Sequence, residues 1–404
     1  MPPFQRSIEY TEIDIKGKKI RLKDKKGNIY TIPNEGEIHN EEKVIDRMRY
    51  YHRRGEMEFT LFDGFRFNNL LPISEEAATI PAAPVVYLDQ CHWSTLAKYQ
   101  YMPEKVPKKD HENIKEITEL ASAGKVVLPL SAGHLVETTA LYEAPRLNLA
   151  KTMLKLSRGW QMVHPLSIRV VELVSVFKER YKGLPRDHIT PFTLKPGRIY
   201  HDFGHTQEDE YEEQPLPDEV KYLNRCLIHT SSLCSTLLDP EKIEPTDTEW
   251  GRRFENIAKE MKEMKLSPKT RKEHSTMFAL TDLTDSIPIA AALAGISRSQ
   301  LEDWFQHKHR EDMAKMPSIG LFADILETRL KNPQEKWPTN DLIDVTYLGP
   351  ASAYADVTVA ERKATNYISK SWGERDGNAP VFKSIPEAME EIRKKVQENT
   401  ARKP

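Results

Sequence analysis

The chain has 404 residues, of which 39% are hydrophobic and 30% are charged; its 59 basic and 61 acidic side chains leave a net charge of −2. This length allows two or three domains, and the near-neutral balance excludes a uniformly basic chain without excluding local basic surfaces. Three cysteines are too few for a disulfide framework, and no apolar run approaches the roughly 18 residues of a membrane span, so we expect a cytoplasmic protein with no membrane partner.

The first 72 residues predict a small β-rich module. IEYTEIDIKG and KKIRLKDKKGNIYTI alternate apolar and polar residues, with turn signals at Gly17 and Gly27. A helix is expected from about Asn40 to Arg54, because apolar residues recur there at helical spacing before Gly55. Residues 73–83 have the composition of a linker.

Basic side chains are frequent in this N-terminal module. Two interpretations stay open: they form an ordinary solvated surface, or they contact a phosphate backbone. The residues concerned are Lys16, Lys18, Lys19, Arg21, Lys23, Lys25, Lys26, Arg47, Arg49, Arg53 and Arg54.

Residues 84–150 predict the first half of an α/β domain. The apolar run VVYL ends on Asp89 and is followed by a helical pattern, which is typical of a buried parallel strand and its crossover. Such folds bind ligands at the carboxyl ends of their strands, where Asp89 would lie.

A second strand is expected at KVVLPL, residues 125–130, after a helix near residues 111–123. Ser131 can cap the helix that follows this strand, and Glu137 falls in its second turn. Glu137 would then point back toward the strand ends.

Residues 151–335 are largely helical in pattern and predict an insertion within the α/β domain. The second half of that domain is expected at residues 336–395, followed by a disordered tail, residues 396–404. Within this half, Asp341 and Asp344 lie one turn apart at the start of a predicted helix.

Residues 357–360 read as a third buried strand, with Asp356 just before it and Glu361 at its carboxyl end. If the strands are parallel neighbours, several of these acids converge at one edge. Carboxylates that close together need a cation, and hard oxygen ligands suit Mg²⁺ or Mn²⁺. Ordinary solvated or helix-capping carboxylates are the alternative in a chain with 61 acidic residues.

This set of acids resembles the PIN-domain nucleases in its order and strand context. The motif VVYLDQ matches the family's first acid at Asp89, and LPLSAGHLVET matches its second at Glu137. NDLIDVTYL matches the third at Asp344 or Asp341, and DVTVAER matches the fourth at Glu361. The matching segments, residues 84–150 and 338–395, cover less than a third of the chain.

The resemblance implies a fold and a reaction. The fold would be a PIN-like parallel sheet flanked by helices, split by the helical insertion and preceded by the β-rich module. The reaction would be endonucleolytic hydrolysis, most often of single-stranded RNA, at a Mg²⁺ or Mn²⁺ site. The implied catalytic ligands are Asp89, Glu137, Asp344 and Glu361, with Asp341 and Asp356 as further metal ligands.

Three further residues are candidates for substrate contact. Arg362 and Lys363 follow Glu361 and could meet phosphate or simply be solvated. His134 lies one turn before Glu137, where a capping or packing role is the alternative.

Two departures from the family pattern favour other functions. Cys91 stands where the family usually has Asn, Ser or Thr, and Glu361 stands where it usually has Asp. These departures favour a catalytically weak PIN fold that binds RNA or protein. A DNA nuclease with the same metal chemistry is a further alternative, which the sequence does not distinguish from an RNase. By analogy alone, a nuclease of this plan suits a toxin-like or phage-defence role, with a protein inhibitor or regulator as partner.

Overall fold

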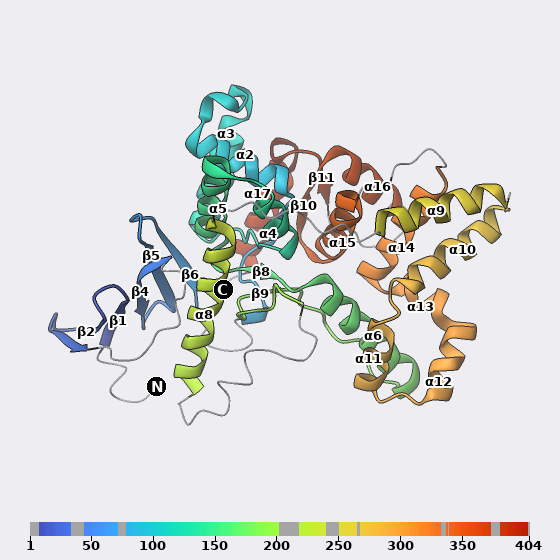
Figure 1. Ribbon diagram of the computed structural model, residues 1–404, viewed down its shortest axis with the longest axis horizontal. Helices are drawn as coiled ribbons and strands as arrows, with labels where there is room; N and C mark the ends of the chain where they lie inside the picture. The colour runs from blue at the N-terminus through green and yellow to red at the C-terminus, as the bar shows by residue number, and fades with distance from the viewer. Residues whose placement is uncertain are drawn as a thin grey trace. The chain divides into compact units, whose positions relative to one another are not determined.

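The computed structural model describes residues 8–33, 44–71, 78–201, 218–239, 250–264, 267–332, 337, 339–372 and 380–402 (Figure 1). Helices and strands are both abundant, so the mixed α/β class expected from the sequence is confirmed. The chain divides into two compact units that are not contiguous in sequence. The first contains Met1–Ala83, Trp93–Met162 and Phe192–Glu244, and the second contains Pro84–His92, Val163–Pro191 and Pro245–Pro404.

The first unit begins with a six-stranded antiparallel sheet, which confirms the β-rich N-terminal module. The strand order is β3-β2-β1-β4-β5-β6, and the turns after β1 and β2 contain Gly17 and Gly27 as expected. The strands are β1 (Ile8–Asp14), β2 (Lys19–Asp24), β3 (Ile29–Pro33), β4 (Ile45–Tyr51), β5 (Glu56–Leu61) and β6 (Arg66–Leu70).

The helix expected from about Asn40 to Arg54 is wrong over its described part, which forms β4. The pairing of β4 with β5 shifts between Ile45 and Arg47, so Asp46 is an extra residue in a β-bulge. The bulge turns both Ile45 and Met48 inward, at 0% and 5% exposure. The helix was expected from the spacing of Val44, Met48 and Tyr51; in β4, Met48 and Tyr51 lie on opposite faces, because side chains alternate along a strand. Residues 40–43 lie outside the described residues.

The rest of the first unit is mainly helical. Helix α5 packs against β6 and α8. A two-stranded antiparallel ladder joins β8 (Gln161–Met162) to β9 (Phe192–Thr193). The helices are most of α2 (Gln90–Tyr101), α3 (His111–Ser122), α4 (Ala132–Thr139), α5 (Glu143–Ser157) and α8 (Asp218–Leu238), with short 3-10 turns at Pro103–Lys105 and Lys108–Asp110.

The strand expected at residues 125–130 does not form. Residues 126–130 are buried, but no residue of the segment lies in a strand, and Leu130 makes an isolated bridge to Gln161. Pro129 lacks an N–H donor, which limits strand pairing there. The apolar run therefore marks burial and not a sheet strand.

The second unit contains a three-stranded parallel sheet in the order β11-β10-β7. Strand β10 (Val357–Val359) pairs with β7 (Val86–Leu88) on one side and with β11 (Val381–Phe382) on the other. The prediction that strands from the two distant segments join in one sheet is confirmed for β7 and β10.

Helices make up most of the second unit. The mainly helical pattern expected for residues 151–335 is found in α5 to α14. The helices of this unit are α6 (Pro165–Lys182), α9 (Trp250–Glu263), α10 (Pro268–Thr281), α11 (Ser286–Ala294), α12 (Arg298–Asp303), a π-helical turn at Trp304–Lys308, α13 (His309–Lys315), α14 (Pro317–Leu330), α15 (Thr339–Tyr354), α16 (Arg362–Trp372) and α17 (Ile385–Arg402).

The tail expected to be disordered from residue 396 is helical as far as Arg402, because α17 continues through it. Lys395 lies near Glu391 and Glu398 on successive turns, and such pairs support an exposed helix.

Two buried carboxylates tie the helices of the second unit together. Glu172 of α6 accepts hydrogen bonds from the first backbone N–H groups of α14, at Ser318 (2.7 Å) and Ile319 (3.0 Å). Asp312 of α13 is 1% exposed and accepts from Arg180 Nε at 2.7 Å and from the Trp304 indole at 2.9 Å. These contacts fix α6 against α13 and α14.

Candidate active site at the carboxyl ends of the parallel strands

Asp89 and Glu361 are adjacent, although 272 residues separate them in sequence. In the parallel ladder Leu88 is paired with Val359, so β7 and β10 end at the same level. The backbone N–H of Asp89 donates to the Val359 carbonyl at 2.8 Å. The backbone N–H of Glu361 in turn donates to Asp89 Oδ2 at 3.3 Å. Two of the acids expected from the sequence thus meet at one edge of the sheet.

The Asp89 carboxylate is almost enclosed, with 8% of the residue exposed. Its Oδ1 accepts the backbone N–H of Gln90, the first residue of α2, at 2.9 Å. Burial raises the pKa of Asp89, and the two backbone donors partly oppose this. A carboxylate at a helix N-terminus also has a plain capping role, and the geometry here serves both roles.

Glu361 is exposed and ends β10 where α16 begins. Its carbonyl accepts the backbone N–H of Thr365 at 2.8 Å, so the residue initiates the helix. Arg362 and Lys363, the two predicted phosphate contacts, are exposed in the first turn of α16. Two exposed cations therefore directly follow Glu361 at the start of α16.

His92 is a member of this group that the sequence analysis missed. It lies one turn into α2, is 8% exposed, and donates its backbone N–H to the Asp89 carbonyl at 2.9 Å. Its ring bonds to the backbone of Ala360, while Nε2 is buried without a hydrogen-bond partner among the described residues. Burial lowers the pKa of His92, which favours the neutral ring. The D-x-x-H spacing of Asp89 and His92 could have identified it, because residues three apart lie in one helical turn.

Asp356 lies at the opposite end of β10. Its Oδ2 accepts the backbone N–H of Val85 at 2.8 Å, just before β7 begins. At about 3.3 Å per residue, the three-residue strand puts Asp356 roughly 10 Å from the Asp89 end. The contact aligns the starts of β7 and β10, which is a structural role.

The predicted helix at Asp341 and Asp344 is confirmed as α15. Asp344 is half-buried in that helix, which packs against β10 and α16. The side chain of Asp341 lies outside the described residues.

Glu137 and His134 belong to α4 in the first unit, whereas Asp89 belongs to the second. Glu137 is half-buried. His134 is 1% exposed; its Nδ1 accepts the backbone N–H of Ser131 at 3.0 Å, and its ring meets Trp93 edge-on at 6.1 Å. The structure thus shows His134 in the capping role, with Ser131 at the N-cap as expected.

Over the described ranges, no three or more His, Cys, Asp or Glu side chains are gathered closely enough to hold a metal ion. The candidate metal ligands at this edge of the sheet are Asp89 and Glu361, with His92 beside them. Carboxylate oxygens suit Mg²⁺ or Mn²⁺, and an imidazole nitrogen is tolerated better by Mn²⁺ than by Mg²⁺.

The sequence matches no protein-family model, no curated protein and no solved structure. Within the described residues no single helix is long and apolar enough to cross a membrane. One pair, Lys272–Thr281 with Ser286–Ala294, passes that test by length and composition, but it is bent by 76°.

Proposed function

We propose that this chain is a metal-dependent endonuclease that hydrolyses single-stranded RNA at the carboxyl ends of β7 and β10. One observation carries the proposal: Asp89 and Glu361, from segments 272 residues apart, lie side by side at that edge. Parallel sheets bind ligands at this edge, and the order of the acids resembles that of PIN-domain nucleases.

The residues of the site have distinct roles in this proposal. Asp89 and Glu361 hold the metal ion, and the enclosure of Asp89 strengthens its attraction for a cation. Mg²⁺ or Mn²⁺, when bound, activates water and neutralises charge on a phosphodiester. Arg362 and Lys363 contact the flanking phosphates of the RNA from the start of α16.

Asp344 is the third ligand in this scheme. Helix α15 leads into β10 and packs against it, so the two run in opposite directions. At about 1.5 Å per residue, the ten residues from Asp344 to Tyr354 span about 15 Å, which is enough to return over the roughly 10 Å from the start of β10 to its carboxyl end. Glu137, which belongs to the other unit, and Asp341 and Asp356 are given no ligand role in this scheme.

The test compares Asp89→Asn with Asp356→Asn. Both replace a carboxylate that accepts backbone N–H groups at opposite ends of the same pair of strands. We expect Mn²⁺-dependent cleavage of a labelled single-stranded RNA to fall at least a hundredfold in Asp89→Asn and to persist in Asp356→Asn. Circular dichroism and thermal unfolding control for folding. Equal activity of the two folded variants would refute the proposal.

A binding module without efficient chemistry is the second candidate. Two observations favour it: the described residues contain no preassembled cluster of three ligands, and the Asp89 carboxylate already accepts two backbone N–H groups. Wild type that binds RNA but leaves it intact in Mg²⁺ and Mn²⁺ would support this function. The same assay on single-stranded DNA separates an RNase from a DNase.

A further inference from the structure

One face of the N-terminal sheet is built from three parallel rows of polar side chains. Strand register defines them, because residues directly opposite on neighbouring strands share a face. The first row is Arg21, Glu12, Arg49 and Glu58 on β2, β1, β4 and β5. The second row is Lys23, Tyr10, Tyr51 and Glu56 on the same strands. The third row is Lys19, Asp14, Arg47, Thr60 and Arg66, which extends across β6.

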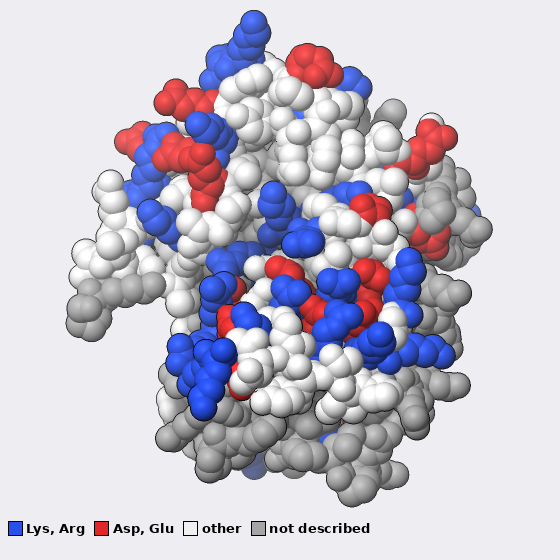
Figure 2. All heavy atoms as spheres, turned by 90° about the vertical axis from the view of Figure 1, so that its left-hand side faces the viewer, with Lys and Arg blue, Asp and Glu red and all other residues white. Residues whose placement is uncertain are grey.

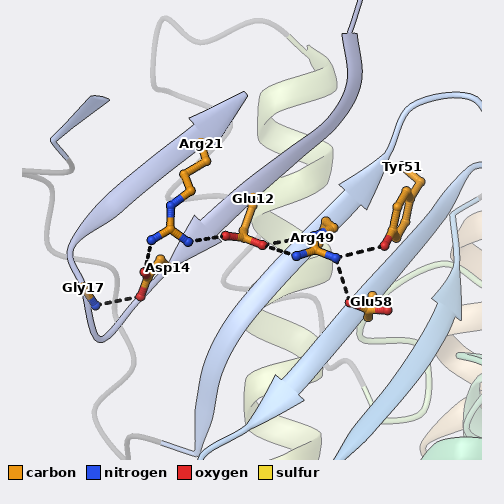
Figure 3. A network of polar contacts seen from close by, with 7 residues as sticks. All are labelled: Glu12, Asp14, Gly17, Arg21, Arg49, Tyr51 and Glu58. Atoms are coloured by element: carbon orange, nitrogen blue, oxygen red, sulfur yellow. Dashed lines mark hydrogen bonds and ion pairs between the residues drawn. The ribbon is translucent and has the colours of Figure 1, made fainter. Parts of the chain in front are cut away.

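In the first row, the two arginines form ion pairs with the two glutamates (Figure 3). Glu12 is 2% exposed and accepts from Arg21 Nη1 at 2.6 Å and from Arg49 Nη2 at 2.5 Å. Arg49 Nη1 also bonds to the Tyr51 hydroxyl at 3.2 Å and approaches Glu58 at 3.5 Å. These two guanidinium groups are therefore committed to holding the sheet.

The second row is also engaged internally. The ring of Tyr10 is flanked by Lys23 Nζ at 5.7 Å and Arg49 Cζ at 4.7 Å. Arg54 lies 5.4 Å from the centre of the Tyr51 ring. Cations therefore lie over Tyr10 and Tyr51, the two aromatic rings of this row.

The third row contains three cations and one acid. Its one acid, Asp14, accepts the backbone N–H of Gly17 at 2.7 Å and Arg21 Nη2 at 3.1 Å. A side chain at Gly17 would meet Asp14 Oδ2 at 2.6 Å, so the turn is shaped around this carboxylate. Asp14 is thus bound to its own hairpin and to the first row. Lys19, Arg47 and Arg66 form no ion pair with any described acid, and Arg47 Nε is buried without a hydrogen-bond partner there.

Charge is distributed unevenly between this sheet and the rest of the chain. Residues 8–33 and 44–71 contain twelve Lys or Arg and eight Asp or Glu, a net charge of +4 in a chain of −2. Figure 2 faces this side of the molecule and shows basic side chains surrounding a smaller acidic patch in the lower half of the view. The surplus of cations is therefore local to this module.

We propose that Lys19, Arg47 and Arg66 form a contact line for the phosphate backbone of a single-stranded RNA. They lie on alternate strands, so at about 4.8 Å per strand the line is about 19 Å long. An extended row of unpaired cations fits an extended polyanion better than a single small anion. Because the three side chains are cations without an aromatic ring, they recognise phosphate independently of base sequence. The choice of RNA as the polyanion rests on the function proposed above.

The test measures binding of the full chain to a fluorescent single-stranded RNA by anisotropy. EDTA prevents cleavage, and the salt concentration is varied. The test variant carries Lys19→Gln, Arg47→Gln and Arg66→Gln. The matched control carries Lys105→Gln, Lys108→Gln and Lys109→Gln, which removes three exposed cations from the 3-10 turns of the same unit.

Each lost phosphate contact lowers the slope of log K against log salt by about 0.7 for a single strand. We expect the test variant to lose about 2 from that slope and to bind about a hundredfold more weakly at 0.1 M salt, whereas the control keeps both. Equal effects in the two variants would overturn the proposal. So would binding of polyglutamate, but not of RNA, to the wild type, because the surface would then be a docking site for acidic protein. Cleavage is measured in a separate assay, with Mn²⁺ and Asp89→Asn, so failure of either proposal is seen separately.

Discussion

Glu12→Gln tests whether the first row holds the sheet together. The substitution keeps the length of the side chain but replaces an acceptor of three guanidinium hydrogen bonds, from Arg21 Nη1, Arg49 Nε and Arg49 Nη2. Hydrogen bonds to charged groups are worth about 1.5–3 kcal/mol each, and glutamine can retain one. Because the Arg21 and Arg49 side chains are 31% and 24% exposed, water can solvate the released groups. We therefore expect a loss of about 2–3 kcal/mol in the free energy of unfolding.

Glu58→Gln is the matched control, since Glu58 meets the same Arg49 at only 3.5 Å. It should cost at most about 1 kcal/mol, as is typical of partly exposed ion pairs. Hydrogen exchange of peptides that cover β1 and β4, measured by mass spectrometry in increasing urea, reports on this sheet alone. If the two variants lose unfolding free energies that agree within about 0.5 kcal/mol, the reasoning is refuted, and Arg21 and Arg49 would be free to bind a ligand.

The pH dependence of the same pair of proteins is a second readout. The contacts with Arg49 and Arg21 lower the pKa of Glu12 although burial opposes them. A lowered carboxyl pKa gives stability that is present above the unfolded value, about 4.3, and is lost as the pH falls through the folded value. The difference between wild type and Glu12→Gln should therefore shrink below about pH 4.

Three other substitutions test single contacts. Asp312→Asn should cost about 2–3 kcal/mol in urea unfolding because the buried carboxylate accepts from both Arg180 and the Trp304 indole, whereas Glu311→Gln, at an exposed pair with the same arginine, should cost under about 1 kcal/mol; similar costs would contradict this. Asp356→Ala should lower stability by about 1–2 kcal/mol, since the N–H of Val85 loses its acceptor; an unchanged urea midpoint would contradict this. Burial lowers the pKa of His229 to about 4, so stability should fall as the pH drops from about 6.5 toward 4, and His229→Leu should flatten that dependence in thermal melts.

The parts of the fold that the sequence predicted depend on short-range patterns. The apolar run before Asp89 and the one before Glu361 are each followed at once by a helix, and both became buried parallel strands. Their adjacency was also predictable, because buried parallel strands need neighbours and the chain offers few such runs. Which acids besides this pair come together depends on tertiary packing, which no local pattern encodes.

The errors have physical causes as well. Val44, Met48 and Tyr51 have the spacing of a helical stripe although Met48 and Tyr51 belong to a strand, and Pro129 limits the pairing of a buried apolar segment. His92 was overlooked because a single histidine on a helix is usually a packing residue. Only the enclosure of its ring next to Asp89 marks it as different.

The way the chain passes between its two units limits how the protein can be divided. Strand β7 belongs to the second unit, yet the segments directly before Pro84 and directly after His92 belong to the first, and the backbone changes unit at five points. A fragment that starts at Val163 would lack β7 and would leave one edge of β10 uncovered. Truncations at apparent domain borders should therefore yield insoluble protein, and separate production of either unit requires rejoining its pieces by circular permutation or splicing.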